Sequence, residues 1–303
     1  MTNLPLIYLD MSALNRIKNG DILWRPDLLQ AVISNEHYTE MSRATYFTDL
    51  TDCLTEIHAM ELAVDCVDGR VVNSAQINPV PDFAYRAAEH INNMKVGQSS
   101  LALARSYMAY FYGAIDASSL IAEVEKLPDI LNELLGENLP PEIDQRGRRA
   151  VEGLVQMTRT ADLWPRGDVG VLEAFAIGKQ QIDNLPSDTV FDEIWKIVRP
   201  IAGDATRDQF FGVDPIDKQG YETWPRYLAA AGLYSMLNLF RHGKDKGLQN
   251  PKRTANILSD GAHTANAMFC DALITHDKGQ AKKARAIYAY LGARTVVTEL
   301  QHA

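Results

Sequence analysis

The chain reads LSDGAHTANAMFCDALITHDKGQAKKARAIYAYLGARTVVTEL over residues 258–300, and this stretch decides the fold class. Its pattern alternates between helix and strand. The spacing of apolar residues predicts a helix over 259–270, a strand over 271–275, a second helix over 278–290 and a second strand over 294–299. Alternating strands and helices imply a parallel sheet with helices on both faces.

The N-terminal part of the chain shows the same alternation. Two short apolar runs predict buried strands over residues 5–10 and 30–34, and a helix is expected between them over 13–20. A longer helix, capped by its first residue, is expected over 35–65, and a turn with a short extended piece over 67–77. The two ends of the chain therefore have the pattern of one α/β domain.

The middle of the chain differs, because helical spacing dominates it from about residue 79 to residue 251. The segments that favour a helix are 82–94, 99–114, 118–136, 145–159, 169–182 and 227–243. We therefore expect an α/β domain formed by residues 1–78 and 252–303, interrupted by a large all-α insertion over 79–251.

The composition is that of an ordinary globular protein, with 303 residues, 46% of them hydrophobic and 23% charged. There is no run of about 18 apolar residues, and the short apolar patch near the N-terminus contains an acid, so we expect neither a membrane span nor a signal peptide. A cytoplasmic location is the expectation that follows. Cys53, Cys66 and Cys270 are odd in number and lack CxxC spacing, so we expect small buried side chains in place of a disulfide framework or a zinc site.

The net charge of −9 argues against nucleic-acid binding, because affinity for phosphate comes mostly from Lys and Arg. The charge is unevenly distributed, however. Residues 241–294 hold ten basic and four acidic side chains, which makes this segment +6 and leaves −15 for the rest of the chain. A local phosphate-binding surface is compatible with this distribution, and so is a solvated charged face.

Four acids fall where a sheet of this kind binds ligands, outside the carboxyl ends of its strands. Asp10 ends the first expected strand, and Asp277 lies two residues beyond the strand DALIT. Glu40 lies early in the helix that follows the second strand, and Asp260 opens the helix that precedes DALIT. Four carboxylates in one crevice repel one another unless cations neutralise them, and all-oxygen sites suit Mg²⁺ or Mn²⁺.

Such a site suits phosphodiester hydrolysis, because one ion lowers the pKa of a bound water and a second stabilises charge on the phosphoryl group and the leaving oxygen. Each acid also has a plainer reading. Asp260 and Asp277 suit helix caps, Asp10 suits a turn and Glu40 suits a solvated surface. Taken one at a time, these plainer readings stay open.

Taken together, the acids and their neighbours resemble the PIN-domain family of metal-dependent nucleases. LIYLDMSAL matches the opening pattern of that family, an apolar strand followed by Asp10 and, two positions on, the small polar Ser12. VISNEHYTE places Glu40 six residues after the serine that ends its strand. DGAHTANA matches the acid that starts a small-residue helix, LITHD the closing strand and its acid, and TVVTEL the last strand. The resemblance covers roughly residues 1–75 and 255–300.

The resemblance implies a PIN-like parallel sheet flanked by helices, and an endonuclease that depends on Mg²⁺ or Mn²⁺. It implies that the metal-binding and catalytic residues are Asp10, Glu40, Asp260 and Asp277. We expect the substrate to be RNA. The alternatives are a structure-specific DNA nuclease and a non-catalytic scaffold that binds nucleic acid or protein, and a protein inhibitor or a homo-oligomer is a further option. PIN domains are often less than half this length, so the resemblance does not extend to the insertion.

Four further side chains lie next to these acids in the sequence. Ser12 and Thr275 are short hydroxyls suited to hydrogen-bonding a carboxylate or a metal-bound water, with turn formation as the alternative. His263 lies one helical turn after Asp260, where it suits either the orientation of a metal-bound carboxylate or a place in the core. Asp271 begins its strand, away from the carboxyl end, so we expect it to play a structural or supporting role.

The helix that follows Asp277 carries a basic face. Lys278, Lys282 and Arg285 are spaced i, i+4, i+7, so they share one side of that helix, and we expect this side to touch substrate phosphates. Haloacid-dehalogenase phosphatases also carry an aspartate after their first strand, but with a second aspartate two residues later. Ser12 stands at that position here, so this reaction class is rejected.

Overall fold

The fold comes from a computed structural model. It describes residues 4–126, 182–243 and 250–301 except Thr45, Gly69 and Gln219, together with Arg149 and Glu152. The chain divides into two compact units. The first comprises Met1–Asn92, Lys179–Asp245 and Ile257–Ala303, and the second comprises Asn93–Gly178 and Lys246–Asn256. The segment expected to form one insertion is thus shared between the two units, and its expected helix over 145–159 lies outside the described residues, apart from Arg149 and Glu152.

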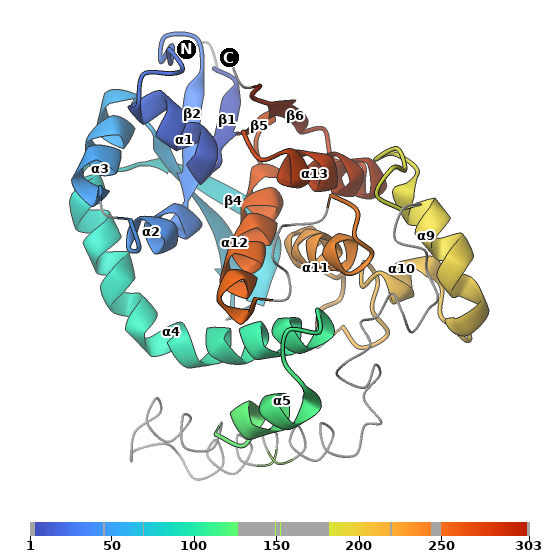
Figure 1. The fold of residues 1–303 in the computed structure, drawn as a ribbon. Helices are drawn as coiled ribbons and strands as arrows, with labels where there is room; N and C mark the ends of the chain where they lie inside the picture. Colours follow the sequence, from blue (N-terminus) through green and yellow to red (C-terminus); the bar gives the residue numbers. More distant parts are fainter. Residues whose placement is uncertain are drawn as a thin grey trace. The chain divides into compact units, whose positions relative to one another are not determined.

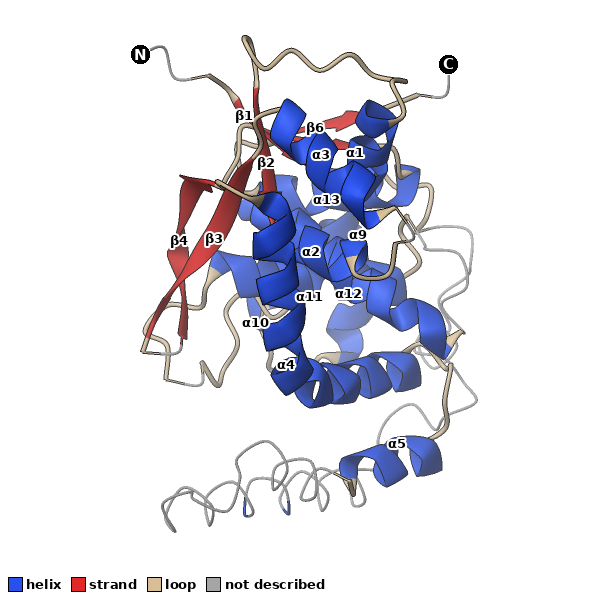
Figure 2. Cartoon of the chain, turned by 90° about the vertical axis from the view of Figure 1, so that its left-hand side faces the viewer, coloured by secondary structure: helices blue, strands red, loops and turns tan. Residues whose placement is uncertain are grey.

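A six-stranded sheet forms the centre of the first unit, in the order β4-β3-β2-β1-β5-β6 (Figure 1). The strands are β1 (Leu6–Leu9), β2 (Gln30–Ser34), β3 (Met60–Val67), β4 (Arg70–Pro79), β5 (Ala272–Thr275) and β6 (Val296–Glu299). All neighbours pair in parallel except β3 and β4, which form an antiparallel pair at one edge (Figure 2). The expected α/β class with a mostly parallel sheet is therefore confirmed.

Helices flank this sheet. Those of the first unit are α1 (Met11–Lys18), α2 (Asn35–Met41), α3 (Phe47–Glu56), α9 (Val190–Val198), η1 (Arg199–Ile201), α10 (Arg207–Phe210), α11 (Arg226–Leu239) and α13 (Lys278–Leu291). The bounds of α4 (Phe83–Phe111) and α12 (Pro251–Ala267) cross from one unit into the other, and α5 (Ala117–Val124) belongs to the second unit. There, Leu120 and Val124 of α5 pack with Tyr110 of α4.

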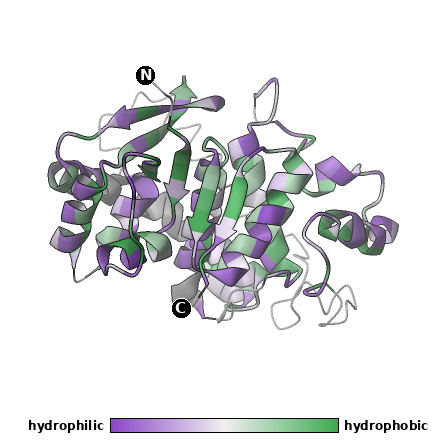
Figure 3. Ribbon diagram, turned by 90° about the horizontal axis from the view of Figure 1, so that it is seen from above, coloured by the Kyte–Doolittle hydropathy of each residue, from purple (hydrophilic) through white to green (hydrophobic). Residues whose placement is uncertain are grey.

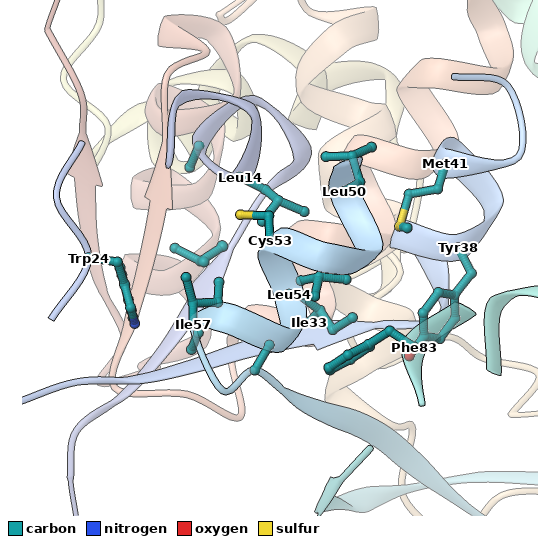
Figure 4. Close-up of a cluster of buried hydrophobic side chains, with 14 of the residues drawn as sticks. Leu14, Trp24, Ile33, Tyr38, Met41, Leu50, Cys53, Leu54, Ile57 and Phe83 are labelled. Carbon is teal, nitrogen blue, oxygen red and sulfur yellow. The ribbon is translucent and has the colours of Figure 1, made fainter. Parts of the chain in front are cut away.

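Residues of β1 alternate between two cores, because successive side chains of a strand point to opposite faces. Ile7 and Leu9 belong to a buried cluster that includes Leu14 of α1 and Leu50 of α3 (Figure 4). Tyr8 points to the other face, where its hydroxyl contacts α12. Viewed from above, the central strands are predominantly hydrophobic, as expected for strands covered on both faces (Figure 3). This burial fixes the register of β1 and therefore the position of Asp10, the residue that follows the strand.

The single helix expected over 35–65 is wrong, because residues 35–41 and 47–56 form two separate helices and the last part of the segment is a strand. The chain forms α2 and α3 and then enters β3 at Met60. β3 pairs in parallel with β2 and antiparallel with β4, so sheet pairing overrides the moderate helix propensity of MELAVD. Ser34 is the N-cap residue of α2, where Asn35 was expected. The prediction that all cysteines are buried is also wrong, because Cys66 of β3 is exposed.

The position expected for Asp260 at the start of a helix is wrong as well. α12 begins nine residues earlier, at Pro251, and ends at Ala267. Proline is well suited to the first position of a helix, because that position needs no N–H donor. Asp260 therefore lies inside α12 and cannot act as its N-terminal cap.

No helix among the described residues combines the length and the apolar character needed to cross a membrane.

Candidate functional site

The candidate site lies where the order of the strands reverses. β1 pairs with β2 on one side and with β5 on the other, although β5 comes much later in the chain. In open α/β sheets, such a reversal opens a crevice at the carboxyl ends of the strands. Asp10 directly follows β1, Ser34 is the last residue of β2, and Asp277 lies two residues after β5.

Asp10 is buried at this point of the sheet, with 4% of its surface exposed. It caps α1, and its Oδ1 accepts a hydrogen bond from the backbone N–H of Ala13 at 2.7 Å. The hydroxyl of Ser12 donates to the carboxylate at 2.8 Å, and the hydroxyl of Thr275 donates to Oδ2 at 2.6 Å. Burial raises the pKa of Asp10, while these three donors and the charge of His263 lower it, and the net direction is upward.

Asp277 is joined to Asp10 through a single hydroxyl. Thr275 Oγ1, which contacts Asp10, accepts the backbone N–H of Asp277 at 2.9 Å. The Asp277 side chain is exposed and caps α13 by accepting the N–H of Gln280 at 2.8 Å. Both acids therefore stand at helix N-termini on neighbouring strands, where the helix dipole favours negative charge.

Glu40 lies in a second group of polar side chains, between α2 and α12. The hydroxyl of Ser259 is 2.7 Å from Glu40 Oε1 and 3.3 Å from Glu36 Oε2, so the two carboxylates share one donor. His263 Nε2 lies 3.4 Å from Glu40 Oε1. Burial raises the pKa of Glu36 and outweighs His263 and Ser259, which lower it, and the charge of Glu40 adds a smaller increase.

His263 acts as the internal counter-charge of these acids. It is 1% exposed, and burial alone opposes its protonation, but its contact with Glu40 and the charges of Glu36 and Asp10 raise its pKa to about 9. Burial would in turn raise the pKa of Glu40, but His263 and Ser259 lower it to about 2. An imidazolium therefore sits among three carboxylates.

A buried chain of hydrogen bonds fixes this imidazolium. Its Nδ1 is 2.8 Å from the hydroxyl of Tyr8, which is 2.6 Å from the hydroxyl of Ser34. Because protonated His263 is a donor at both nitrogens, the chain runs from His263 to Tyr8 to Ser34. Neighbouring His37 stays neutral, because burial and the charge of His263 lower its pKa to about 3. His37 uses Nε2–H to bond Leu9 O at 2.6 Å, so β1, β2 and α12 are tied together here.

The four expected ligands do not form one cluster. The Asp10 carboxylate is connected through Thr275 to the backbone N–H of Asp277, and Glu40 contacts His263. Asp260 is half-buried in α12, about 100° around the helix axis from Ser259. Among the described residues, no three Asp, Glu, His or Cys side chains lie close enough to hold one metal ion. The arrangement is therefore no all-protein metal cage.

The expected phosphate-binding face is largely occupied by acids of the same chain. Lys282 pairs with Asp183, with 3.1 Å between Nζ and Oδ1, and Arg285 lies 3.6 Å from Glu299. Lys278 is exposed and forms no ion pair with any residue that the structure describes. At the far end of β5, Asp271 Oδ2 accepts the backbone N–H of Leu6 at 2.8 Å.

Several residues of the site were missed from the sequence. Glu36 could have been found, because it precedes Glu40 by four residues and so shares its helix face. Gln280 offered a weaker signal, its place in the first turn after Asp277. Tyr8 offered none, because a tyrosine inside an apolar strand predicts only core.

A cavity of about 420 Å³ lies elsewhere, between the β3–β4 pair and the start of α4. Among its charged groups, Arg86 bonds Glu61 at 2.8 Å and Glu89 at 2.8 Å. None of the expected site residues lines it.

No protein-family model, curated protein or solved structure matches the chain. The site is therefore interpreted from its own chemistry. Carboxylate and hydroxyl oxygens gather at the strand reversal. Within the described residues, no Lys or Arg forms an ion pair with Asp10, Glu36 or Asp277. Hard oxygen ligands that no Lys or Arg neutralises suit a divalent cation.

Proposed function

We propose that this chain is a nuclease that hydrolyses phosphodiester bonds with the help of Mg²⁺ or Mn²⁺, that it acts preferentially on RNA, and that its fold is PIN-like with a helical insertion. One observation carries the proposal. Asp10 is buried at the strand reversal without a Lys or Arg partner in the described chain, and the Thr275 hydroxyl links its carboxylate to the backbone N–H of Asp277. A carboxylate whose pKa is raised by burial in this way is typical of functional sites.

The donor set fits Mg²⁺ in type and in number. Mg²⁺ is commonly held by one or two carboxylates, with waters and substrate phosphate completing the shell, so the lack of a three-ligand cluster does not exclude it. Asp10 and Asp277 are the residues that would hold the ion. When bound, the ion would lower the pKa of a water and offset negative charge on the phosphoryl group.

The chain's own side chains orient these acids. Ser12 accepts the N–H of His276 at 2.9 Å and donates to Asp10, and Thr275 accepts the N–H of Asp277 and donates to Asp10. Both hydroxyls are thus polarised toward the same carboxylate, which holds its oxygens in place. Glu40 of α2 is held ionised by the charge of His263, which lies on α12.

Substrate contact is assigned to Lys278. Because Lys282 and Arg285 pair with acids of the chain, Lys278 is the cation of the expected face whose ammonium group is available next to Asp277. A single cation at this position favours phosphate contact without selection of bases. We further propose that the protein is located in the cytoplasm.

The test is cleavage of labelled single-stranded RNA and of a flap DNA, with Mg²⁺, with Mn²⁺ and with a chelator. We expect metal-dependent cleavage of RNA by the wild type and loss of at least 100-fold in Asp10→Asn and Asp277→Asn, since each loses a ligand charge. Asp52→Asn, at an exposed position of α3, is the matched control and should retain activity. Cleavage of the flap DNA alone would redirect the proposal to DNA. A wild type that cleaves neither substrate would refute it.

A further inference from the structure

Gln280 lies next to Asp10 and Thr275, although it is neither one of the expected acids nor one of the hydroxyls expected beside those acids. It occupies the first turn of α13 and is fully buried. Its side-chain Oε1 lies 2.8 Å from Thr275 Oγ1, and that hydroxyl lies 2.6 Å from Asp10 Oδ2. The Gln280 amide is thus one hydroxyl away from the buried carboxylate.

The Thr275 hydroxyl has more acceptors than it can serve. It accepts the N–H of Asp277 and lies within hydrogen-bond distance of both Asp10 Oδ2 and Gln280 Oε1. A hydroxyl carries one proton, which can satisfy one of these two oxygens. A carboxylate accepts more strongly than an amide, and the distance to Asp10 is the shorter, so the proton belongs to Asp10. Gln280 Oε1 and Thr275 Oγ1 would then face each other as two acceptors.

The other atom of the same amide removes the conflict. Gln280 Nε2 is buried and has no hydrogen-bond partner within the described residues. The oxygen and nitrogen of a glutamine amide have nearly the same shape, and their assignment follows from the hydrogen bonds around them. Turning the amide by half a rotation places an N–H donor on Thr275 Oγ1 and moves Oε1 to the position that Nε2 held, so the two acceptors no longer face each other.

We propose that Gln280 is a positioning residue of this site: its amide N–H donates to the Thr275 hydroxyl and so directs the single hydroxyl proton to Asp10. The effect on catalysis rests on the proposed nuclease function, whereas the orientation of the amide is independent of that function. The hydrogen bonds run in one direction, from Gln280 to Thr275 to Asp10. Without the amide donor, Thr275 Oγ1 keeps only the N–H of Asp277 to orient its lone pairs, so the direction of its O–H bond toward Asp10 is less firmly fixed.

The first test is structural and independent of activity. In labelled wild-type protein, NMR should show one Gln280 side-chain amide proton shifted downfield and protected from exchange, and Thr275→Val should abolish both effects. Amide protons of Gln280 that exchange as fast as those of exposed glutamines would overturn the proposed orientation.

The second test uses variants of nearly equal volume. In Gln280→Met, which lacks the donor, we expect kcat for RNA cleavage to fall about tenfold with KM within about twofold, as is typical when a partner of a ligand is lost. Gln280→Glu should fall at least as far, because it competes with Asp10 for the Thr275 proton. Gln301→Met, at an exposed position, is the control. In a Thr275→Val background, Gln280→Met should have no further effect on kcat, whereas a merely structural role would give additive losses.

The two proposals fail in different ways. A wild type without metal-dependent cleavage, but with a protected Gln280 amide proton, would refute the nuclease function and retain the orientation of Gln280. An active wild type in which Gln280→Met and Gln280→Glu keep full kcat would refute the positioning role alone.

Discussion

The ion pair between Glu40 and His263 gives the most direct quantitative test of the site's electrostatics. We consider the substitutions His263→Gln and Glu40→Gln and the double variant. Each single change leaves the other member of the pair without its partner, and His263 is 1% exposed. Removing one partner of a buried pair is costly, because the remaining charge stays desolvated.

The structure sets the size of the effect. A pKa of His263 raised from 6.5 to about 9 corresponds to roughly 3 kcal/mol of differential stability, at about 1.36 kcal/mol per pKa unit. The lowered pKa of Glu40 reports the same interaction from the other partner, so the two values are not added. The Glu40 side chain is 21% exposed, and solvent screens part of the attraction, so we expect a coupling free energy of about 2 kcal/mol.

This coupling depends on pH with a defined sign. Because the pKa of folded His263 is raised above its ordinary value of 6.5, its stabilisation is complete below pH 6.5 and is lost as the pH rises through about 9. Because the pKa of folded Glu40 is lowered from 4.5, its stabilisation is complete above pH 4.5 and is lost as the pH falls through about 2. The pair therefore contributes most between pH 4.5 and pH 6.5.

The assay is urea unfolding of the four proteins in metal-free buffer, near pH 6 and near pH 9.5, with the coupling obtained from the double-mutant cycle. We expect about 2 kcal/mol near pH 6 and less than about 0.5 kcal/mol near pH 9.5. A coupling below about 0.5 kcal/mol near pH 6, or one equal at both pH values, would show that His263 does not neutralise Glu40.

Three further predictions follow from the geometry. Millimolar Mg²⁺ or Mn²⁺ should raise the melting temperature of the wild type by a few degrees, because an ion that binds only the folded state stabilises that state. The melting temperature of Asp10→Asn should stay unchanged, and equal shifts in both proteins would argue against Asp10 as a metal ligand. Gly243→Ala should lower the unfolding free energy by about 2 kcal/mol, because φ is +59° and the new Cβ would lie 2.8 Å from a backbone carbonyl of α13. Gly232→Ala, whose Cβ meets nothing within 4 Å, should be neutral or stabilising, and equal losses would contradict the clash. Lys278→Ala should weaken RNA binding and reduce its salt slope by about 1, with exposed Lys196→Ala as control, and an unchanged slope would remove Lys278 from the phosphate contact.

Elements with strong local signals were predictable from the sequence. α13 begins after the capping Asp277 and ends at Gly292, which has the left-handed conformation that glycine adopts freely. β5 was expected from its apolar run and its flanking polar residues. In each case, the information lies within a few residues of the element itself.

Elements decided by distant contacts were not predictable. Met60–Val67 became β3 because β2 and β4 pair with it from either side, and no local signal records those partners. The start of α12 was misplaced because Asp260 is a good capping residue in isolation, whereas Pro251 opens the helix. Local preference is a weak guide wherever tertiary contacts decide.

The candidate site shows the same division. Asp10 and Asp277 could be picked out as candidates because Asp10 directly follows β1 and Asp277 lies two residues after β5, which the sequence makes visible. The pairing of Glu40 with His263 and the contact of Gln280 with Thr275 join segments whose orientation depends on the folded sheet. Spacing along the chain identifies candidate acids, but it does not reveal which donor forms a hydrogen bond with each carboxylate.

The place of β5 beside β1 has a consequence for biosynthesis. β5, the neighbour of β1 on one side, emerges from the ribosome more than 250 residues after β1. Until then, Asp10 has neither the Thr275 hydroxyl nor Asp277 beside it. In a nascent chain, the hydrogen bonds that connect Asp10 with the end of β5 therefore form only after β5 has entered the sheet.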